Sequence, residues 1–310
     1  MPQSWLQKLL PEITLKDPPI VSLKSELFDR KGLHLSMLRL DQIHENIPGN
    51  KLFKLIYFLQ EAKKLPAKKI LTFGGAYSNH LAATAFACSQ LNIDSIGIVR
   101  GEKSHSPSPT IQFCEKHGMK LQFISREDFR NINEKSFLEK LGKIYGEHVL
   151  VNEGGFSTRG KEGAALIQHF FSDKDFSHIC LPVGTATTFS GLVDGNEKET
   201  NILGFGVLKN MHDIAKRFRE LKVSASKKYT FINDYHFGGY AKKNPELIAF
   251  MNQFYDENKI TLDFVYTGKM MYGVYDLIRK NYFAKGSNIL CIHTGGLQGN
   301  DSLRVGTLNY

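Results

Sequence analysis

Short apolar runs alternate with segments of helical length along almost the whole chain of 310 residues. Each run has about the length of a buried strand, and each segment between two runs can form a helix that joins parallel strands. The expected strands are 70–73, 95–99, 120–124, 148–151, 178–183, 202–207 and 288–293. The expected helices are 54–65, 80–91, 136–145, 159–171, 211–221, 245–257 and 271–282. The alternation predicts an α/β protein with doubly wound parallel sheets.

Four of the expected strands fall between residues 70 and 151, which is enough for a small sheet of their own. We place boundaries near Asn50 and near Gly154-Gly155. The sequence therefore predicts a small inserted α/β domain of residues 50–154 and a large domain made of residues 1–49 and 155–310.

Charge and cysteine usage narrow the class of protein. Lys and Arg number 40 and Asp and Glu 31, which gives a net charge of +9, but the lysines are dispersed as isolated doublets. Without a basic block or arm we expect no nucleic-acid partner, and the basic surface would instead attract small anions. The four cysteines stand far apart without a metal-ligand spacing, so we expect reduced, mostly buried thiols and no metal.

The chain contains no apolar run of about 18 residues, so no membrane span is expected. Its N-terminal segment, "MPQSWLQKLLPEITLKD", lacks the long apolar region of a secretory signal. We therefore expect a cytoplasmic protein.

Polar turns follow three of the expected strands. Ser78, Asn79 and His80 come after the strand 70–73, the loop 182–191 follows the strand 178–183, and "HTGG" (293–296) follows the last strand. In open parallel sheets, ligands bind beyond the carboxyl ends of the strands. Ser and Asn also cap helices, so an ordinary capped turn is the alternative for 78–80.

The loop "VGTATTFSG" is a candidate phosphate site. Gly184 allows close approach of the backbone, and the following residues Thr185, Ala186, Thr187 and Thr188 present N–H groups and hydroxyls at the start of a helix. The loop has neither the GxGxxG spacing of a dinucleotide fold nor the lysine of a P-loop, so it suits a single phosphate monoester. A capped turn is again the alternative.

Lys51 follows a Gly-Asn pair at the start of an expected helix. Alone, such a lysine is usually a solvated surface residue. Beside a phosphate site, an amine can form a Schiff base with an aldehyde-bearing phosphate ester, which is the chemistry of pyridoxal phosphate.

Seven segments then occur in a specific order: "GNKLFKL", "GGAYSNH", "VNEGGFSTRG", "VGTATTFSG", "NDYHFGGYAKK", "VYTGKMMYG" and "HTGG". In this order they resemble the pyridoxal-phosphate enzymes of the 1-aminocyclopropane-1-carboxylate deaminase and D-cysteine desulfhydrase family. The resemblance extends from about Pro18 to the C-terminus. It implies the tryptophan synthase β-subunit fold (fold type II), pyridoxal 5'-phosphate bound by the large domain, a small amino-acid substrate and a homodimer.

The resemblance also implies roles for individual residues. Lys51 bonds covalently to the cofactor, and Asn79 hydrogen-bonds the phenolic oxygen of the cofactor. Ser78 lies beside the carboxylate and α-carbon of the substrate, which Asn79 and His80 help to bind. The loop from Gly184 to Thr188 holds the phosphate.

Further roles follow for the C-terminal segments. Tyr266 stacks on or beside the pyridine ring and is counted with Lys51 and Ser78 as catalytic. Thr267 and Thr294 are expected close to the pyridine nitrogen. The sequence leaves open whether Lys51 or Ser78 takes the α-proton.

Four features favour D-cysteine as the substrate. Deaminases of the family have Glu and Leu at the positions of Thr267 and Thr294, Gln at the position of His80, and a Trp in the loop that here reads "RGEKSHSP". A neutral hydroxyl beside the ring nitrogen leaves the pyridine ring a weak electron sink. A weak sink suffices when a thiolate leaves with the electrons, but it is poor for opening the cyclopropane ring. We therefore expect D-cysteine desulfhydrase activity, which yields pyruvate, sulfide and ammonia.

Other functions stay open. They are a 1-aminocyclopropane-1-carboxylate deaminase that forms 2-oxobutanoate and ammonia, and a degenerate relative that binds the cofactor without catalysis. Phe53 and Tyr77 depart from the arginine and glutamine usual in the family, which leaves another D-amino acid or β-substituted alanine open as the substrate. A dehydrogenase would need a Gly-rich fingerprint and a ribose-binding acid, which we do not find.

Overall fold

A computed structural model describes residues 5–209 and 211–310, and it contains two sheets. The larger sheet has the strand order β1-β2-β10-β7-β8-β9, and only the pair β1 and β2 is antiparallel. Its strands are β1 (Ile20–Ser22), β2 (His34–Arg39), β7 (His178–Val183), β8 (Asn201–Gly206), β9 (Thr230–Ile232) and β10 (Asn288–His293). The last strand of the chain therefore lies inside the sheet, between β2 and β7.

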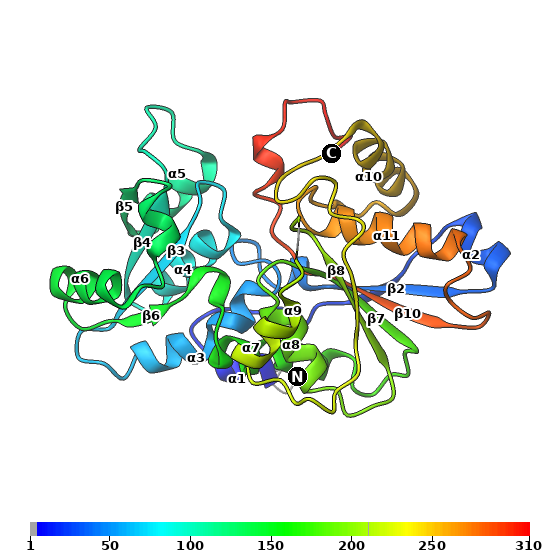
Figure 1. Ribbon diagram of the computed structural model, residues 1–310, viewed down its shortest axis with the longest axis horizontal. Coiled ribbons are helices and arrows are strands. Elements are labelled where there is room, and N and C mark those ends of the chain that lie inside the picture. The colour runs from blue at the N-terminus through cyan, green and yellow to red at the C-terminus, as the bar shows by residue number, and fades with distance from the viewer. Residues whose placement is uncertain (1–4, 210) are drawn as a thin grey trace.

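The smaller sheet is entirely parallel and has the order β5-β4-β3-β6. Its strands are β3 (Lys69–Gly74), β4 (Asp94–Arg100), β5 (Lys120–Ile124) and β6 (Val149–Val151). Figure 1 shows the two sheets side by side, each in a lobe of its own. We call them the small lobe and the large lobe.

Helices cover both faces of the large sheet (Figure 1). One apolar core joins α2, α10 and α11 to one face, and another joins α1, α3, α8 and α9 to the opposite face. The helices are α1 (Trp5–Leu9), α2 (Glu26–Lys31), α3 (Lys51–Ala62), α4 (Asn79–Gln90), α5 (Pro109–Lys116), α6 (Lys135–Tyr145), α7 (Thr158–Ala165), α8 (Thr187–Asp194), α9 (Ile214–Glu220), α10 (Pro245–Asn258) and α11 (Thr267–Arg279). Short 3-10 turns are η1 (Leu40–Gln42), η2 (Asp128–Asn131), η3 (Glu153–Gly155), η4 (Leu166–Phe170) and η5 (Asn300–Ser302).

The core that contains α3 continues into the small lobe, because Ile70, Ala87 and Val149 belong to the same cluster as Leu181 and Leu290. The two lobes therefore share buried side chains along α3. The domain boundaries stay a prediction, and residues 1–4 of the first predicted segment lie outside the described residues.

All seven strands expected from the sequence are confirmed, whereas β1, β2 and β9 were not expected. The helix expected from residue 54 begins at Lys51 instead, and the helix expected at 271–282 is α11, four residues earlier at its start. The helix expected at 211–221 is shortened to α9, and α1, α2, α5 and α8 were not expected. All four cysteines are buried and free, as expected. Within the described ranges, no helix has the length and apolar character needed to cross a membrane.

Candidate active site

Lys51 is the first residue of α3, and its position is set from the end of β10. The main-chain N–H of Asn50 donates to the carbonyl of Thr294 at 3.0 Å. Gly49 has a φ of 85°, and a Cβ at this position would overlap the carbonyl oxygen of Thr294. The turn before Lys51 is therefore packed against the turn that follows the last strand.

A small cavity of about 60 Å³ lies beside the amine of Lys51. It is lined by the loop from Pro182 to Phe189 together with Asn50, Lys51, Lys54, Gly154, Tyr266 and Thr294. Ala186 has a φ of 72° and directly precedes α8, whose first turn has no side-chain cap. The N-terminal N–H groups of α8 and the hydroxyls of Thr185 and Thr187, 3.0 Å apart, make this cavity suitable for an anion.

Hydrogen bonds connect Lys51 to this loop. Its Nζ donates to Oδ1 of Asn50 at 2.7 Å, and Nδ2 of Asn50 donates to Oγ1 of Thr188 at 2.8 Å. The amine lies 5.7 Å from the centre of the Tyr266 ring. Burial lowers the pKa of Lys51 to about 8, against an opposing effect of the Asp263 carboxylate. A large fraction of this amine is therefore neutral, and nucleophilic, near pH 8.

Lys54 is a site residue that the sequence reasoning missed. Its side chain is buried in the same cavity, and its Nζ donates to the carbonyl of Gly154 at 3.0 Å. Burial holds its pKa well below the ordinary value, and the charge of Lys51 lowers it further. The spacing of three residues on one helix was the available signal, because it places both lysines on the same face of α3.

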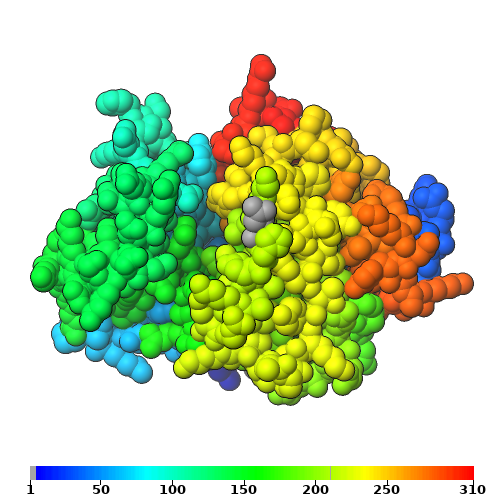
Figure 2. Space-filling model, in the orientation of Figure 1, coloured from blue at the N-terminus to red at the C-terminus, as the bar shows by residue number. Residues whose placement is uncertain are grey.

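A wider cavity of about 260 Å³ adjoins the first, and Lys51, Gly154, Gly184, Thr185 and Tyr266 border both. Its walls come from both lobes, and Figure 2 shows the surface hollowed between the lobes. Further lining residues are Gly75, Ser78, Asn79, His80, Arg100, Glu153, Leu208 and Tyr240. Ser78, Asn79 and His80 thus lie together with Lys51, as the sequence predicts.

Ser78 caps the helix α4, because its Oγ accepts from the N–H of Leu81 at 3.2 Å. Asn79 reaches the turn after β10, where its Nδ2 donates to the carbonyl of Gly296 at 3.3 Å. The Oδ1 of Asn79 is buried without a partner among the described residues. A bound group that donates a hydrogen bond to this oxygen would remove the cost of leaving it unpaired.

The ring of His80 is held by the small sheet. Oγ1 of Thr72 donates to the carbonyl of Val151 at 2.8 Å, so it accepts from Nε2 of His80 at 2.9 Å. Burial, together with the charges of Lys54 and Lys51, lowers the pKa of His80 to about 3. His80 therefore borders the cavity as a neutral, fixed imidazole.

Three polar residues of the wider cavity were not picked out from the sequence: Arg100, Glu153 and Tyr240. The guanidinium of Arg100 lies 5.4 Å from the centre of the Phe129 ring. Burial raises the pKa of Glu153, and the charge of Arg100 opposes this rise. The rings of Tyr240 and Tyr266 meet edge to face, 6.3 Å apart.

The two threonines expected near the pyridine nitrogen differ in position. Thr294 lines the small cavity, whereas Thr267 lines neither cavity and is fully buried. The hydroxyl of Thr267 donates to Oδ1 of Asp263 at 2.9 Å. The structure therefore does not bring Thr267 together with the other predicted site residues.

Asp263 is the second buried group that the sequence reasoning missed. Its carboxylate accepts from the N–H groups of Val265, Tyr266 and Thr267 at 2.8–2.9 Å. Burial raises its pKa, and these hydrogen bonds oppose the rise. Asp263 thereby fixes the backbone that carries Tyr266 into both cavities.

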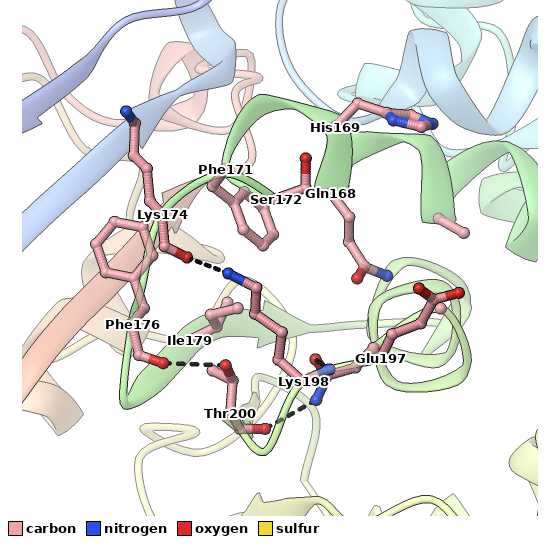
Figure 3. A pocket seen from close by; sticks show the side chains of 13 residues that line it. Gln168, His169, Phe171, Ser172, Lys174, Phe176, Ile179, Glu197, Lys198 and Thr200 are labelled. Atoms are coloured by element: carbon pink, nitrogen blue, oxygen red, sulfur yellow. Dashed lines mark hydrogen bonds between the residues drawn. The ribbon is translucent and has the colours of Figure 1, made fainter.

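Another cavity, of about 340 Å³, lies in the large lobe and is drawn in Figure 3. Its polar side chains bond to the protein itself: Nζ of Lys198 donates to the carbonyl of Lys174 at 2.8 Å, and Oγ1 of Thr200 donates to that of Phe176 at 3.0 Å. It contains none of the residues that the sequence predicts for the site.

The residues of the two adjoining cavities fit pyridoxal phosphate. The small cavity offers the N-terminal N–H groups of α8 and the amine of Lys54 for a phosphate. The amine of Lys51 lies at the border with the wider cavity, where an unpaired amide oxygen of Asn79 and an aromatic side chain of Tyr266 are found.

Comparisons with known proteins agree with this assignment. A family model described as "Pyridoxal-phosphate dependent enzyme" matches residues 19–295. A Thermotoga maritima protein provisionally named 1-aminocyclopropane-1-carboxylate deaminase is 28% identical over 93% of this chain and 96% of its own length. A mitochondrial bifunctional D-cysteine desulfhydrase/1-aminocyclopropane-1-carboxylate deaminase of Arabidopsis thaliana is 27% identical over 86% of this chain and 73% of its own. The crystal structure of an ACC deaminase homologue superimposes with a TM-score of 0.78 and 25% identity, covering 96% of both chains.

Proposed function

Since this chain belongs to the family of pyridoxal-phosphate dependent enzymes, we propose that it is a lyase that eliminates sulfide from D-cysteine. It has fold type II and is an enzyme of the 1-aminocyclopropane-1-carboxylate deaminase and D-cysteine desulfhydrase type, with pyridoxal phosphate as its cofactor. The proposal concerns the substrate and the roles of the residues.

One observation carries the proposal: the amine of Lys51 borders both an anion cavity and a cavity suited to an amino acid. The free N–H groups of α8, the hydroxyls of the loop and the amine of Lys54 would hold the phosphate. Tyr266 and Asn79 would contact the ring. When bound, the cofactor supplies an aldehyde for the Lys51 amine and an electron sink for the amino-acid substrate.

The N-terminus of α4 is suited to the carboxylate of the substrate. Ser78 caps this helix of 12 residues, whose partial positive charge points into the wider cavity together with the guanidinium of Arg100. A carboxylate held there fixes the α-carbon of the amino acid relative to Lys51. Positioning of this kind accounts for a large part of the rate acceleration in many enzymes.

We assign the α-proton to Lys51 rather than to Ser78. The lowered pKa of Lys51, about 8, leaves a neutral amine available as a base. A serine needs a neighbouring base to take a proton, and the Oγ of Ser78 is already the acceptor for Leu81. After the α-proton is removed, thiolate leaves the β-carbon. Overall, D-cysteine and one water give pyruvate, ammonia and hydrogen sulfide.

The preference for D-cysteine over ring opening rests on the residues at four positions. Thr294 lines the small cavity where deaminases of the resembled type have Leu, and His80 stands where they have Gln. Thr267 replaces their Glu, and the loop after β4 has no Trp. The name of the Arabidopsis relative covers both activities, so 1-aminocyclopropane-1-carboxylate deaminase is the second candidate.

The test is an assay of both substrates side by side with protein loaded with pyridoxal phosphate. We expect sulfide and pyruvate from D-cysteine and little or no 2-oxobutanoate from the cyclopropane acid. Formation of 2-oxobutanoate from the cyclopropane acid, with no sulfide from D-cysteine, would instead favour 1-aminocyclopropane-1-carboxylate deaminase activity. Retention of the visible colour of the bound cofactor, without turnover of either acid, would favour a degenerate relative. The cytoplasmic location and the homodimer stay predictions.

A further inference from the structure

Lys269 is a buried lysine for which the proposed function has no use. It is the third residue of α11, and its side chain is fully buried. Its Nζ donates to the carbonyls of His236 and Gly239, at 2.9 and 2.7 Å. Because a buried ammonium is costly unless it is hydrogen-bonded, these two contacts stabilise both the lysine and the loop that it reaches.

That loop connects β9 to α10 and has an unusual backbone. Phe237, Gly238, Gly239 and Ala241 all have positive φ values, between 50° and 117°. The left-handed region is unfavourable for the non-glycine residues, so the loop needs contacts that hold it. The ammonium of Lys269 supplies two of them, at the residues on either side of Phe237 and Gly238.

The loop carries Tyr240 into the wider cavity, directly after Gly239. The side chain of Tyr240 is 45% exposed, so packing alone does little to fix it. Its ring meets that of Tyr266, the residue that precedes the first turn of α11. The start of one helix therefore supports both tyrosines: Tyr266 directly, and Tyr240 through Lys269.

We propose that Lys269 is a positioning residue that sets the place of Tyr240 in the substrate cavity by holding the carbonyls of residues 236 and 239. The proposal rests on the proposed function in one respect, namely that the wider cavity binds the substrate. Lys269 itself touches neither cavity.

A coupled pair of variants tests this role with D-cysteine and the protein loaded with cofactor. Lys269→Met keeps the length of the side chain and removes both hydrogen bonds, and we expect kcat/KM to fall by roughly tenfold or more. In a Tyr240→Ala background the same change should cost less than about twofold, because a residue that acts through Tyr240 has nothing left to position. Equal losses in both backgrounds would overturn the proposal.

The rate of limited cleavage by trypsin after Lys242 and Lys243 measures how often the loop between β9 and α10 opens. This measurement does not require an active enzyme. We expect Lys269→Met to be cleaved there at least roughly tenfold faster than the wild type, since local opening exposes the chain. Lys280→Met is the matched control, because Lys280 is exposed at the end of the same helix and pairs with Asp276 at 2.7 Å. An unchanged cleavage rate in Lys269→Met would overturn the proposal for Lys269, whether or not the wild type is active. Failure of the wild type to turn over either substrate would refute only the proposed function.

If Lys269→Met does not fold, Gly239→Ala provides a second test of whether the loop positions Tyr240, because it changes the loop and leaves Lys269 in place. Gly239 has a φ of 117°, where a Cβ is strained, and the new Cβ would lie 3.1 Å from Cβ of Lys209. We expect this variant to lose activity with Tyr240 present and to lose little more in the Tyr240→Ala background. Unchanged kcat/KM in Gly239→Ala would count against the loop as the element that positions Tyr240.

Discussion

The Nζ of Lys51 donates a 2.7 Å hydrogen bond to Oδ1 of Asn50, the residue that precedes it. The same Asn50 side chain donates to Thr188, and its main chain donates to Thr294. One asparagine therefore connects the reactive amine to the anion loop and to the end of the central strand. The protein's own side chains therefore orient the amine.

The two lysines of α3 should behave differently when replaced. Lys51→Ala is expected to abolish covalent attachment of pyridoxal phosphate and activity, because it removes the amine that borders both cavities. Lys54→Ala should keep the attachment and weaken cofactor binding, because the Lys54 side chain lines the anion cavity but not the wider cavity. The measurement is borohydride reduction followed by peptide mapping. A pyridoxyl group on Lys54 would contradict the assignment.

Changes in the anion loop should act on cofactor affinity more than on chemistry. Thr188→Ala removes a hydroxyl that lines the anion cavity and should weaken cofactor binding by about 1.5–3 kcal/mol, the usual range for a hydrogen bond with a charged partner such as a phosphate. Gly184→Val should weaken it as well, since a Cβ there would lie 3.2 Å from Cε1 of Tyr266. Equilibrium dialysis of the cofactor measures both, with Thr200→Ala in the separate cavity as the control. An unchanged dissociation constant of the cofactor in both variants would indicate that the phosphate binds elsewhere.

The reactivity of Lys51 should change with pH near 8. Only the neutral amine attacks an aldehyde, and burial lowers the pKa of Lys51 to about 8. The rate at which the apoprotein takes up pyridoxal phosphate should therefore rise with pH and level off above about 8. Asp263 raises the pKa of Lys51, so Asp263→Asn should move the midpoint to lower pH. Asp256→Asn, an exposed position, is the control.

A midpoint near the ordinary lysine value of about 10.4 would contradict this prediction. The same result would remove the physical basis for Lys51 as the base that takes the α-proton.

Thr267→Glu should destabilise the fold, whatever it does to substrate choice. Thr267 is fully buried and bonds Asp263, so a glutamate would place a second carboxylate beside a buried one. We expect a loss of about 3 kcal/mol or more in the free energy of unfolding, in the range measured for uncompensated buried charges. Denaturant unfolding checks this, with Thr294→Leu as the comparison. A variant as stable as the wild type would indicate that residue 267 can reach solvent or the cofactor.

The sequence predicted the parts of the fold that repeat a simple pattern. Strands β3, β4, β7, β8 and β10 are apolar runs that are buried along most of their length, and such runs stand out from their surroundings. The shorter β6 and the half-buried β5 also have mostly apolar sequences. The strands β1 and β9 have three residues each and acquire their strand structure only by pairing with a neighbour. The antiparallel pairing of β1 with β2 likewise has no local signal.

The site residues likewise divide into those with a local sequence signal and those without one. Lys51 and Ser78 were found because they follow glycine-containing turns. Lys54 contacts the distant Gly154, and Asp263 acts on the pKa of the distant Lys51, so neither role has a local sequence signal. Thr267 was expected beside a ring nitrogen, but its hydroxyl is bound to Asp263, four positions earlier. Sequence spacing could not distinguish these two directions of one side chain.

The place of β10 has a consequence for the order in which the protein can be built during translation. The strands β3 to β6 are all present once residue 151 has been synthesised, so the small sheet can form early, soon after these residues leave the ribosome. The large sheet has a gap between β2 and β7 until residues 288–293 emerge, since β10 pairs with both. The turn that orients Lys51 packs on the residues directly after β10. A nascent chain therefore acquires its reactive lysine in working position only after β10 and the turn that follows it have been made.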